Sequence, residues 1–240
     1  MKAQETNVSG FSTMSSAIEF ADNYSNWIVD NFRPYIGTSI LEIGTGQGNF
    51  KQFLSNAKTY VSIDVSDEVL ERAAQRDSAG IYIQTDISTP DCLDKVKGFK
   101  FDTALCTNVL EHIENDKAAI QNIIELLDTG GRLLLFIPAF QALYSDMDRL
   151  AGHYRRYSKK TVSDLFGNNI LLEQLEYFNP IGGLGWWINK FIPHRDLDSA
   201  SINTQIKLFD RYIVPVSKLL NPISKNWFGQ SLVCVAKKQS

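Results

Sequence analysis

Ser39-Ile-Leu-Glu-Ile-Gly-Thr-Gly-Gln-Gly-Asn49 is the stretch of this sequence that decides the fold. It is a short apolar run that contains one acid and then breaks into three glycines at alternate positions. This pattern is typical of a buried strand followed by a tight turn and the start of a helix. Such a turn brings the backbone of an α/β protein close to a nucleotide-like ligand.

The spacing of the glycines indicates which ligand the turn binds. A dinucleotide fingerprint has the spacing G-x-G-x-x-G, because its third glycine lets the helix pack closely on the strand. Gly44, Gly46 and Gly48 are instead spaced G-x-G-x-G. Glu42, near the end of the strand, would repel a pyrophosphate but could hold a cation or accept hydrogen bonds. The stretch therefore favours a positively charged cofactor, and the alternative is a plain strand-to-helix turn.

Residues 40–48 resemble the first motif of class I S-adenosylmethionine (SAM) methyltransferases. The resemblance implies that SAM is the cofactor. It also implies that the residues of this motif lie against SAM, and these are Glu42, Gly44, Thr45, Gly46 and Gly48.

Bulk properties limit the classes of function. A chain of 240 residues with 44% hydrophobic side chains suits one α/β domain. The net charge of -3 gives no general attraction to nucleic acid. No leader-like or membrane-spanning stretch is visible, which predicts a soluble, cytoplasmic protein. The cysteines at positions 92, 106 and 234 are far apart, so we expect neither a disulfide framework nor a metal site.

Apolar runs alternate with amphipathic segments along the chain, which predicts a parallel sheet with helices on both faces. We expect strands at 39–43, 59–64, 81–84, 101–106, 132–138, 171–178 and 231–237. We expect helices at 16–32, 49–55, 67–76, 116–127 and 159–166. The fold class is α/β, a Rossmann-like three-layer sandwich. The family resemblance adds that the sheet has seven strands, with the last one antiparallel.

The resemblance implies a single SAM-methyltransferase domain with four segments. Residues 1–37 are expected to form a helical cap, and residues 38–178 the cofactor-binding core. Residues 179–230 form an aromatic-rich insertion, and residues 231–240 contain the last strand.

Acidic residues follow the second and third expected strands, at the edge of the sheet where ligands of open α/β sheets bind. Asp64 follows the first glycine at the spacing at which an acid accepts hydrogen bonds from both ribose hydroxyls. The resemblance implies that Asp86 binds the adenine amino group and that Val65 or Ile87 lies on an adenine face. The alternative is that both aspartates only cap the next turn or helix.

The fourth strand runs into Thr107-Asn-Val-Leu-Glu-His-Ile113. This segment resembles small-molecule methyltransferases of the ubiquinone and menaquinone biosynthesis type, which implies that Asn108 and Val109 face the methionine part of SAM. It lacks the Asn/Asp-Pro-Pro-aromatic turn used on base amines and glutamine amides, so those acceptors are disfavoured. His112 is a candidate proton acceptor, and the alternative is a packed structural histidine.

The fifth strand leads into a long loop, residues 136–157, that is dense in Asp, His, Arg and Tyr. Such a loop lies where a substrate enters. Its Gly152-His-Tyr-Arg-Arg-Tyr157 resembles a bacterial branch of the SAM methyltransferases. His153 is the first candidate for a general base and Tyr157 the second. The alternative is a salt-bridge cluster that orders the loop.

Tyr24, on the leading helix, is a candidate for closing over the sulfonium or the carboxylate of the cofactor. The alternative is that its ring simply packs in the core.

The insertion at 179–230 is too long for a bare loop and must form structure of its own. It contains three of the four tryptophans and an excess of basic residues. A helical stripe of apolar residues is expected at positions 202, 206, 209, 213 and 216, with Pro215 restarting the helix. Four roles remain open: a lid, a pocket for an apolar or lipid-like substrate, a face that touches a membrane, or a homodimer interface.

These observations predict a SAM-dependent methyltransferase that methylates an O or N atom of a small, partly apolar metabolite. One alternative is a nicotinamide-dependent oxidoreductase of the same architecture. Another is a non-catalytic SAM-binding or membrane-associated module.

Overall fold

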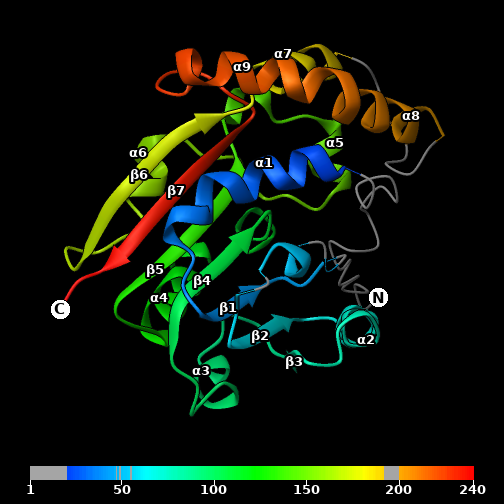
Figure 1. The fold of residues 1–240 in the computed structure, drawn as a ribbon. Coiled ribbons are helices and arrows are strands. Elements are labelled where there is room, and N and C mark those ends of the chain that lie inside the picture. The colour runs from blue at the N-terminus through cyan, green and yellow to red at the C-terminus, as the bar shows by residue number, and fades with distance from the viewer. Residues whose placement is uncertain (1–20, 47, 49, 55, 192–199) are drawn as a thin grey trace, which may run out of the picture.

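The computed structural model describes residues 21–240 except 47, 49, 55 and 192–199. One sheet contains seven strands in the order β3-β2-β1-β4-β5-β7-β6 (Figure 1). Only β7 runs antiparallel to its neighbours, β5 and β6. The strands are β1 (Ser39–Ile43), β2 (Thr59–Asp64), β3 (Ile81–Gln84), β4 (Phe101–Thr107), β5 (Leu127–Pro138), β6 (Ile170–Phe178) and β7 (Ser231–Lys238). This topology confirms the predicted Rossmann-like fold class.

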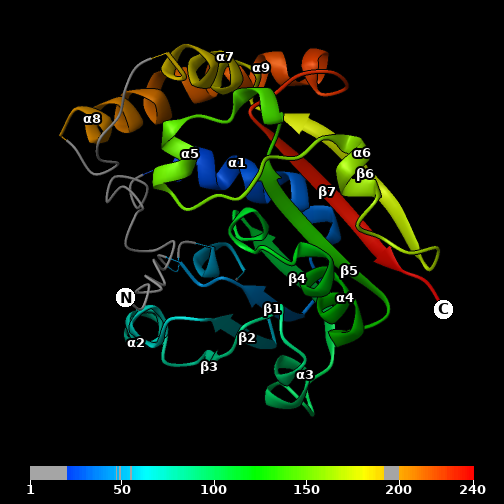
Figure 2. The same cartoon turned by 180° about the vertical axis from the view of Figure 1, so that it is seen from behind.

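Helices cover both faces of the sheet, and each layer encloses its own apolar core (Figures 1 and 2). On one face α1 (Asp22–Phe32) packs Trp27, Ile28 and Phe32 against β1 and β5. On the other face α4 (Asp116–Leu126) buries Ile120 and Ile123, as the apolar spacing predicts. The remaining helices of the core are α2 (Asp67–Arg76), α3 (Asp91–Lys95) and α6 (Lys159–Ser163).

Three expected element bounds are wrong. The described residues of the expected helix at 49–55 form only a 3₁₀ turn, η4 (Lys51–Phe53), because the left-handed glycines extend the loop before it. Helix α6 ends at Ser163 rather than at 166. Strand β5 begins at Leu127, before the glycine pair at 130 and 131, and so takes up the end of the expected helix. The expected helix at 16–32 begins at Asp22 within the described residues, and positions 16–20 lie outside them.

The insertion between β6 and β7 is helical and lies beyond α1, at the end of the sheet formed by β6 and β7 (Figure 1). It contains α7 (Pro180–Asn189), α8 (Ala200–Leu208), a π-helical turn η7 (Phe209–Ile213) and α9 (Val214–Ser224). None of the helices in the described part of the chain is long and apolar enough to cross a bilayer.

The expected apolar stripe of the insertion is confirmed only in part, because Ile206 and Phe209 are half-buried and Phe209 packs against the core under α1. Ile213 and Val216 are exposed, at 36% and 47%. The wide π turn changes the helical register ahead of Pro215, where α9 begins, so the side that faces the core carries other residues. The side chain at position 202 lies outside the described residues.

Candidate functional site

The glycine loop after β1 has the left-handed backbone that its composition predicts. Gly44, Gly46 and Gly48 have φ values of +76°, +51° and +72°, which side chains with a Cβ rarely adopt. A Cβ on Gly44 would lie 2.3 Å from Cγ2 of Val109, so the loop touches the segment after β4. Among the described residues, a Cβ on Gly46 would meet nothing within 4 Å. The backbone at Gly46 is therefore open to a ligand.

Glu42 and Thr45 hold this loop to the neighbouring strand. The buried Glu42 carboxylate accepts hydrogen bonds from Tyr60 Oη and, at 3.0 Å, from Ser62 Oγ. Thr45 Oγ1 lies 2.7 Å from Ser62 Oγ. Burial raises the pKa of Glu42 to about 7. Both side chains thus bond into the sheet beneath the loop rather than across its open side.

Asp64 and Asp86 lie beyond the carboxyl ends of adjacent strands, β2 and β3. Asp64 accepts a hydrogen bond from the Ser66 amide at 3.0 Å, and the amides of Thr45 and Gly46 also bond to it. Burial raises the pKa of Asp64 against the effect of these amides. Asp86 is exposed and accepts two bonds from Ser88, from its amide at 2.8 Å and its hydroxyl at 2.7 Å.

Two buried hydroxyls near these strand ends have no hydrogen-bond partner within the part of the chain that the structure describes. Thr85 Oγ1 lies after β3 and Thr107 Oγ1 at the end of β4. An unpaired buried hydroxyl costs about 1 to 3 kcal/mol. A polar ligand at this edge would remove that cost.

Of the other residues predicted to bind the cofactor, some are exposed and some are buried. Val65 is 56% exposed beside Asp64, whereas Ile87 is buried in the core. Asn108 is exposed, with a left-handed φ of +52°, and starts the turn that brings Val109 to the glycine loop.

Tyr24 lies on α1, and its ring contacts those of Phe136 and Phe178 at the ends of β5 and β6. Its hydroxyl bonds to Asn179 and Ser231, and burial raises its pKa to about 12. Tyr24 therefore sits at the sheet's carboxyl edge but on the side of the insertion.

The loop after β5 brings His153 against the turn after β4. His153 Nδ1 lies 2.9 Å from Oδ1 of Asp148, which is on the short helix α5 (Asp146–Leu150) and fully buried. Its Nε2 faces Oε1 of Glu111 at 3.9 Å, which is beyond hydrogen-bond length. The His112 ring meets the His153 ring edge-on at 4.6 Å. Glu111 and His112 belong to the 3₁₀ turn η5 (Leu110–His112).

Burial and neighbouring charges shift the pKa values of Glu111, His112 and Asp148. It raises the pKa of Glu111 to about 7 and, together with His153, lowers that of His112 to about 4. Burial also opposes ionisation of Asp148, but hydrogen bonds from His153 and Arg156 hold its pKa below the ordinary range. Asp148 is thus an anion that accepts from Nδ1, which leaves Nε2 of His153 as the basic nitrogen.

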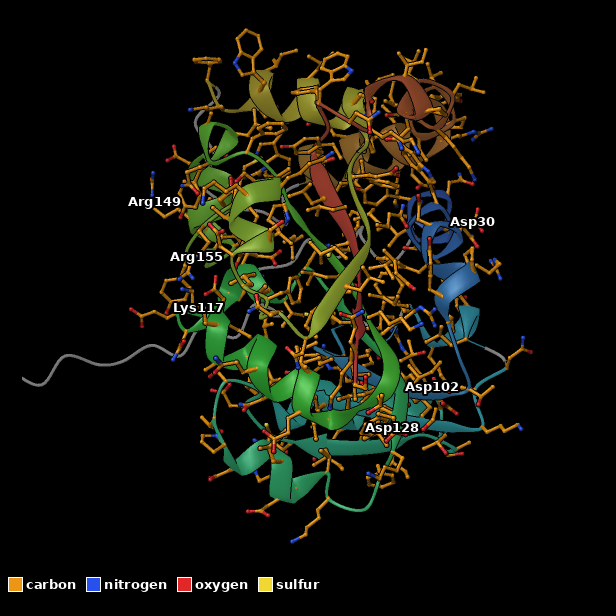
Figure 3. All side chains as sticks on the ribbon, turned by 90° about the vertical axis from the view of Figure 1, so that its left-hand side faces the viewer. Asp30, Asp102, Lys117, Asp128, Arg149 and Arg155 are labelled. Carbon is orange, nitrogen blue, oxygen red and sulfur yellow. The ribbon has the colours of Figure 1, made fainter. Side chains whose placement is uncertain are left out.

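The predicted salt-bridge cluster of the loop forms in part. Arg156 Nε donates to Asp148 at 2.7 Å, whereas Asp146 pairs with Arg149 at the surface. Arg155 instead reaches Asp116, at 2.7 Å, and Figure 3 shows Arg149 and Arg155 along one side of the molecule.

Tyr157 is buried beside the turn that carries Glu111. Its hydroxyl lies 2.9 Å from Asp116 and 3.2 Å from the Leu110 carbonyl oxygen, and burial raises its pKa above the ordinary range. These contacts join the loop to the turn, and the assignment of Tyr157 as the second candidate base stays a prediction.

Sequence reasoning gave Glu111 and Trp186 no part in the site. Glu111 Oε2 is buried with no hydrogen-bond partner among the described residues. Trp186 Nε1 donates to Asp148 at 3.3 Å from helix α7. Glu111 could have been predicted from the sequence, because it is an acid next to the candidate His112. Trp186 could not, because nothing in its neighbouring sequence indicates a contact with Asp148. Within the described part of the chain, Glu111, His112 and His153 are the residues whose ligand atoms could hold a metal ion, all within 4.8 Å of one another.

Comparisons with known proteins agree with this fold. A family model described as a methyltransferase domain matches residues 41–133, the segment that carries the glycine loop and β1 to β4. An S-adenosylmethionine dependent methyltransferase from Mesorhizobium loti superposes with a TM-score of 0.59 at 15% identity, covering 91% of this chain and all of that one. The chain has the fold of class I methyltransferases.

Another solved structure and two sequence relatives are also similar to this chain. The N-methyltransferase NodS of Bradyrhizobium japonicum WM9, in complex with S-adenosylhomocysteine, matches with a TM-score of 0.54 at 15% identity, over 94% of this chain and 88% of that one. A ubiquinone biosynthesis O-methyltransferase of Xanthomonas euvesicatoria is 27% identical over 101 residues, 41% of this chain. An uncharacterized 37.1 kDa protein in transposon TN4556 of Streptomyces fradiae is 25% identical over 159 residues, 65% of this chain. The chain spans only 42% and 46% of the lengths of these last two relatives.

Proposed function

We propose that this chain is a SAM-dependent methyltransferase that methylates an O or N atom of a small, partly apolar metabolite in the cytoplasm. The observation that carries the proposal is the left-handed loop at Gly44 and Gly46, with Asp64 at the end of the next strand. The family match over this segment favours a methyltransferase over a nicotinamide-dependent oxidoreductase.

The residues at the strand ends fit SAM. Asp64 would accept from the ribose hydroxyls, Val65 would lie on the adenine, and Asp86 would accept from its amino group. The open backbone at Gly46 and the turn at Asn108 would border the methionine part. When bound, SAM supplies an electrophilic methyl group on a sulfonium.

The acceptor's proton, where one must leave, passes to Nε2 of His153. Asp148 fixes the ring by accepting from Nδ1, so the basic nitrogen points toward Glu111 and His112. A positioned base of this kind accelerates a reaction by about 10² to 10⁴. His112, whose pKa is lowered to about 4, stays neutral and lines the same space.

Helix α7 acts as a lid over the part of the site next to His153, where the methyl acceptor would bind. Trp186 donates to Asp148, and its ring stacks under the Arg156 guanidinium at 4.6 Å. Lys190 Nζ reaches the Ala142 carbonyl at 2.7 Å. The Trp186 indole, which shares the Asp148 carboxylate with His153, favours an acceptor with an apolar part.

Two experiments test the proposal in sequence. Isothermal titration with SAM, S-adenosylhomocysteine and NADH should show binding of the first two only, and tight NADH binding without SAM binding would refute the cofactor. Transfer of a labelled methyl group from SAM to metabolite and lipid extracts should then label one acceptor. The His153→Asn variant, which keeps a donor for Asp148, is the control that should bind SAM without labelling. Binding with no label in any extract would favour a non-catalytic module.

A further inference from the structure

The outer surface of α7, η7 and α9 is strongly apolar. Phe191, Leu219, Ile223 and Trp227 are 69%, 77%, 72% and 65% exposed, and Trp187 and Tyr212 also lie open. Figure 3 shows side chains projecting outward from these helices, at the end of the molecule opposite Asp102 and Asp128. We call this surface the outer face. Exposed apolar patches of this kind mark an interaction surface.

The uncharged polar residues of α9 and the acid of η7 are buried and fix this orientation. Asp210 is buried and accepts from the Tyr24 amide at 2.8 Å. Ser217 Oγ donates to Oδ1 of Asn179 at 2.7 Å, and Asn221 Oδ1 accepts from the Asn179 amide at 2.9 Å. Rotating α9 to bury its leucines would leave these groups without partners, at about 1 to 3 kcal/mol each. The apolar face is therefore held outward.

The charges of the insertion indicate which kind of partner binds to the outer face. Its described helices and the residues joining them to β7 carry five basic side chains, Lys190, Lys207, Arg211, Lys218 and Lys225. Their single acid, Asp210, is buried. Several of these cations lean back to the body of the protein, as Lys218 does to Asp30 at 3.0 Å and Lys225 to Glu176 at 2.8 Å. The outer face itself consists of apolar residues and tryptophans, and Arg211 lies over the ring of its Tyr212.

We propose that the outer face docks on the surface of an anionic lipid bilayer. Tryptophan, leucine and isoleucine side chains insert at the headgroup level, and neighbouring lysines and arginines are attracted by anionic lipids. A second copy fits less well, because a symmetric contact would bring two insertions of net positive charge together. This inference depends on the outer face alone and not on the proposed methyl transfer.

Sedimentation of the full chain with vesicles tests the proposal. We expect the protein to pellet with vesicles of phosphatidylcholine mixed with phosphatidylglycerol, and much less with phosphatidylcholine alone. The double variant Leu219→Glu/Ile223→Glu should lower the partition coefficient by at least about tenfold, because two apolar insertions are lost. Leu171→Glu, at an exposed apolar position of β6 outside the face, is the matched control and should bind like the parent.

Each other outcome overturns the proposal. Failure to pellet with either vesicle, or unchanged binding of the double variant with an unchanged melting temperature, removes the bilayer as the occupant. Equal binding to both vesicles removes the anionic lipid. Sedimentation velocity identifies the rival: a dimer that forms without vesicles and is lost in the double variant assigns the face to a second copy.

Discussion

Glu42 should make the stability of this protein depend on pH in a defined direction. Burial raises its pKa from 4.5 to about 7, so the folded state keeps a proton that the unfolded chain releases. A group whose pKa is raised by folding stabilises the folded state fully below the unfolded value. That stability is lost as the pH rises through the folded value. At ~1.4 kcal/mol per pKa unit, the loss between pH 4.5 and pH 7.5 is about 3 kcal/mol.

The Glu42→Gln variant isolates this contribution. Glutamine keeps the shape and an oxygen that accepts from Tyr60 and Ser62, but it cannot ionise. Urea denaturation should give the variant and the parent similar free energies of unfolding at pH 5. At pH 8 the variant should be more stable by about 3 kcal/mol. Glu173→Gln is the control of opposite sign, because Arg132 lowers the pKa of Glu173. If the difference between Glu42→Gln and the parent is the same at both pH values, the buried acid is not protonated as argued.

The other predictions concern the His153 cluster and the cofactor residue Asp64. His153→Asn should lower kcat by about 10² to 10⁴ in the methyl-transfer assay, with SAM affinity unchanged; a normal kcat would show that His153 is not the base. Asp148→Asn should cost about 3 to 5 kcal/mol in denaturant unfolding because it breaks a buried ion pair, whereas Asp146→Asn at the surface should cost less than about 1 kcal/mol. Similar costs for the two would contradict the burial of Asp148. Asp64→Ala should weaken SAM binding at least about fivefold in titration calorimetry, and an unchanged affinity would remove Asp64 from the site.

The sequence predicted those parts of the fold and site whose causes are local. Alternate glycines need left-handed backbone, so the loop at Gly44 to Gly48 was visible from composition and spacing. The seven strands were likewise visible as apolar runs, although β5 begins earlier than expected. The helix expected at 49–55 was wrong, because its described residues form only the 3₁₀ turn η4.

Contacts between distant segments could not be predicted in this way. Asp148 and Asp146 look equivalent in sequence, yet only Asp148 is buried against His153 and Arg156. The inward face of α9 is polar because Asn179, 38 residues before Ser217, supplies its partners. A rule that places apolar residues inside therefore assigned this helix the wrong face.

Asp148 connects the histidine to the helical insertion. Its carboxylate accepts from Ser145, His153, Arg156 and Trp186, so donors on four residues favour its ionised form. An ionised Asp148 keeps the proton of His153 on Nδ1, which leaves Nε2 free to accept one. One of these donors, Trp186, lies on α7, and the next residue, Trp187, belongs to the outer face. A shift of α7 on a bilayer would therefore alter the hydrogen bonding of Asp148 before it altered any contact of the glycine loop.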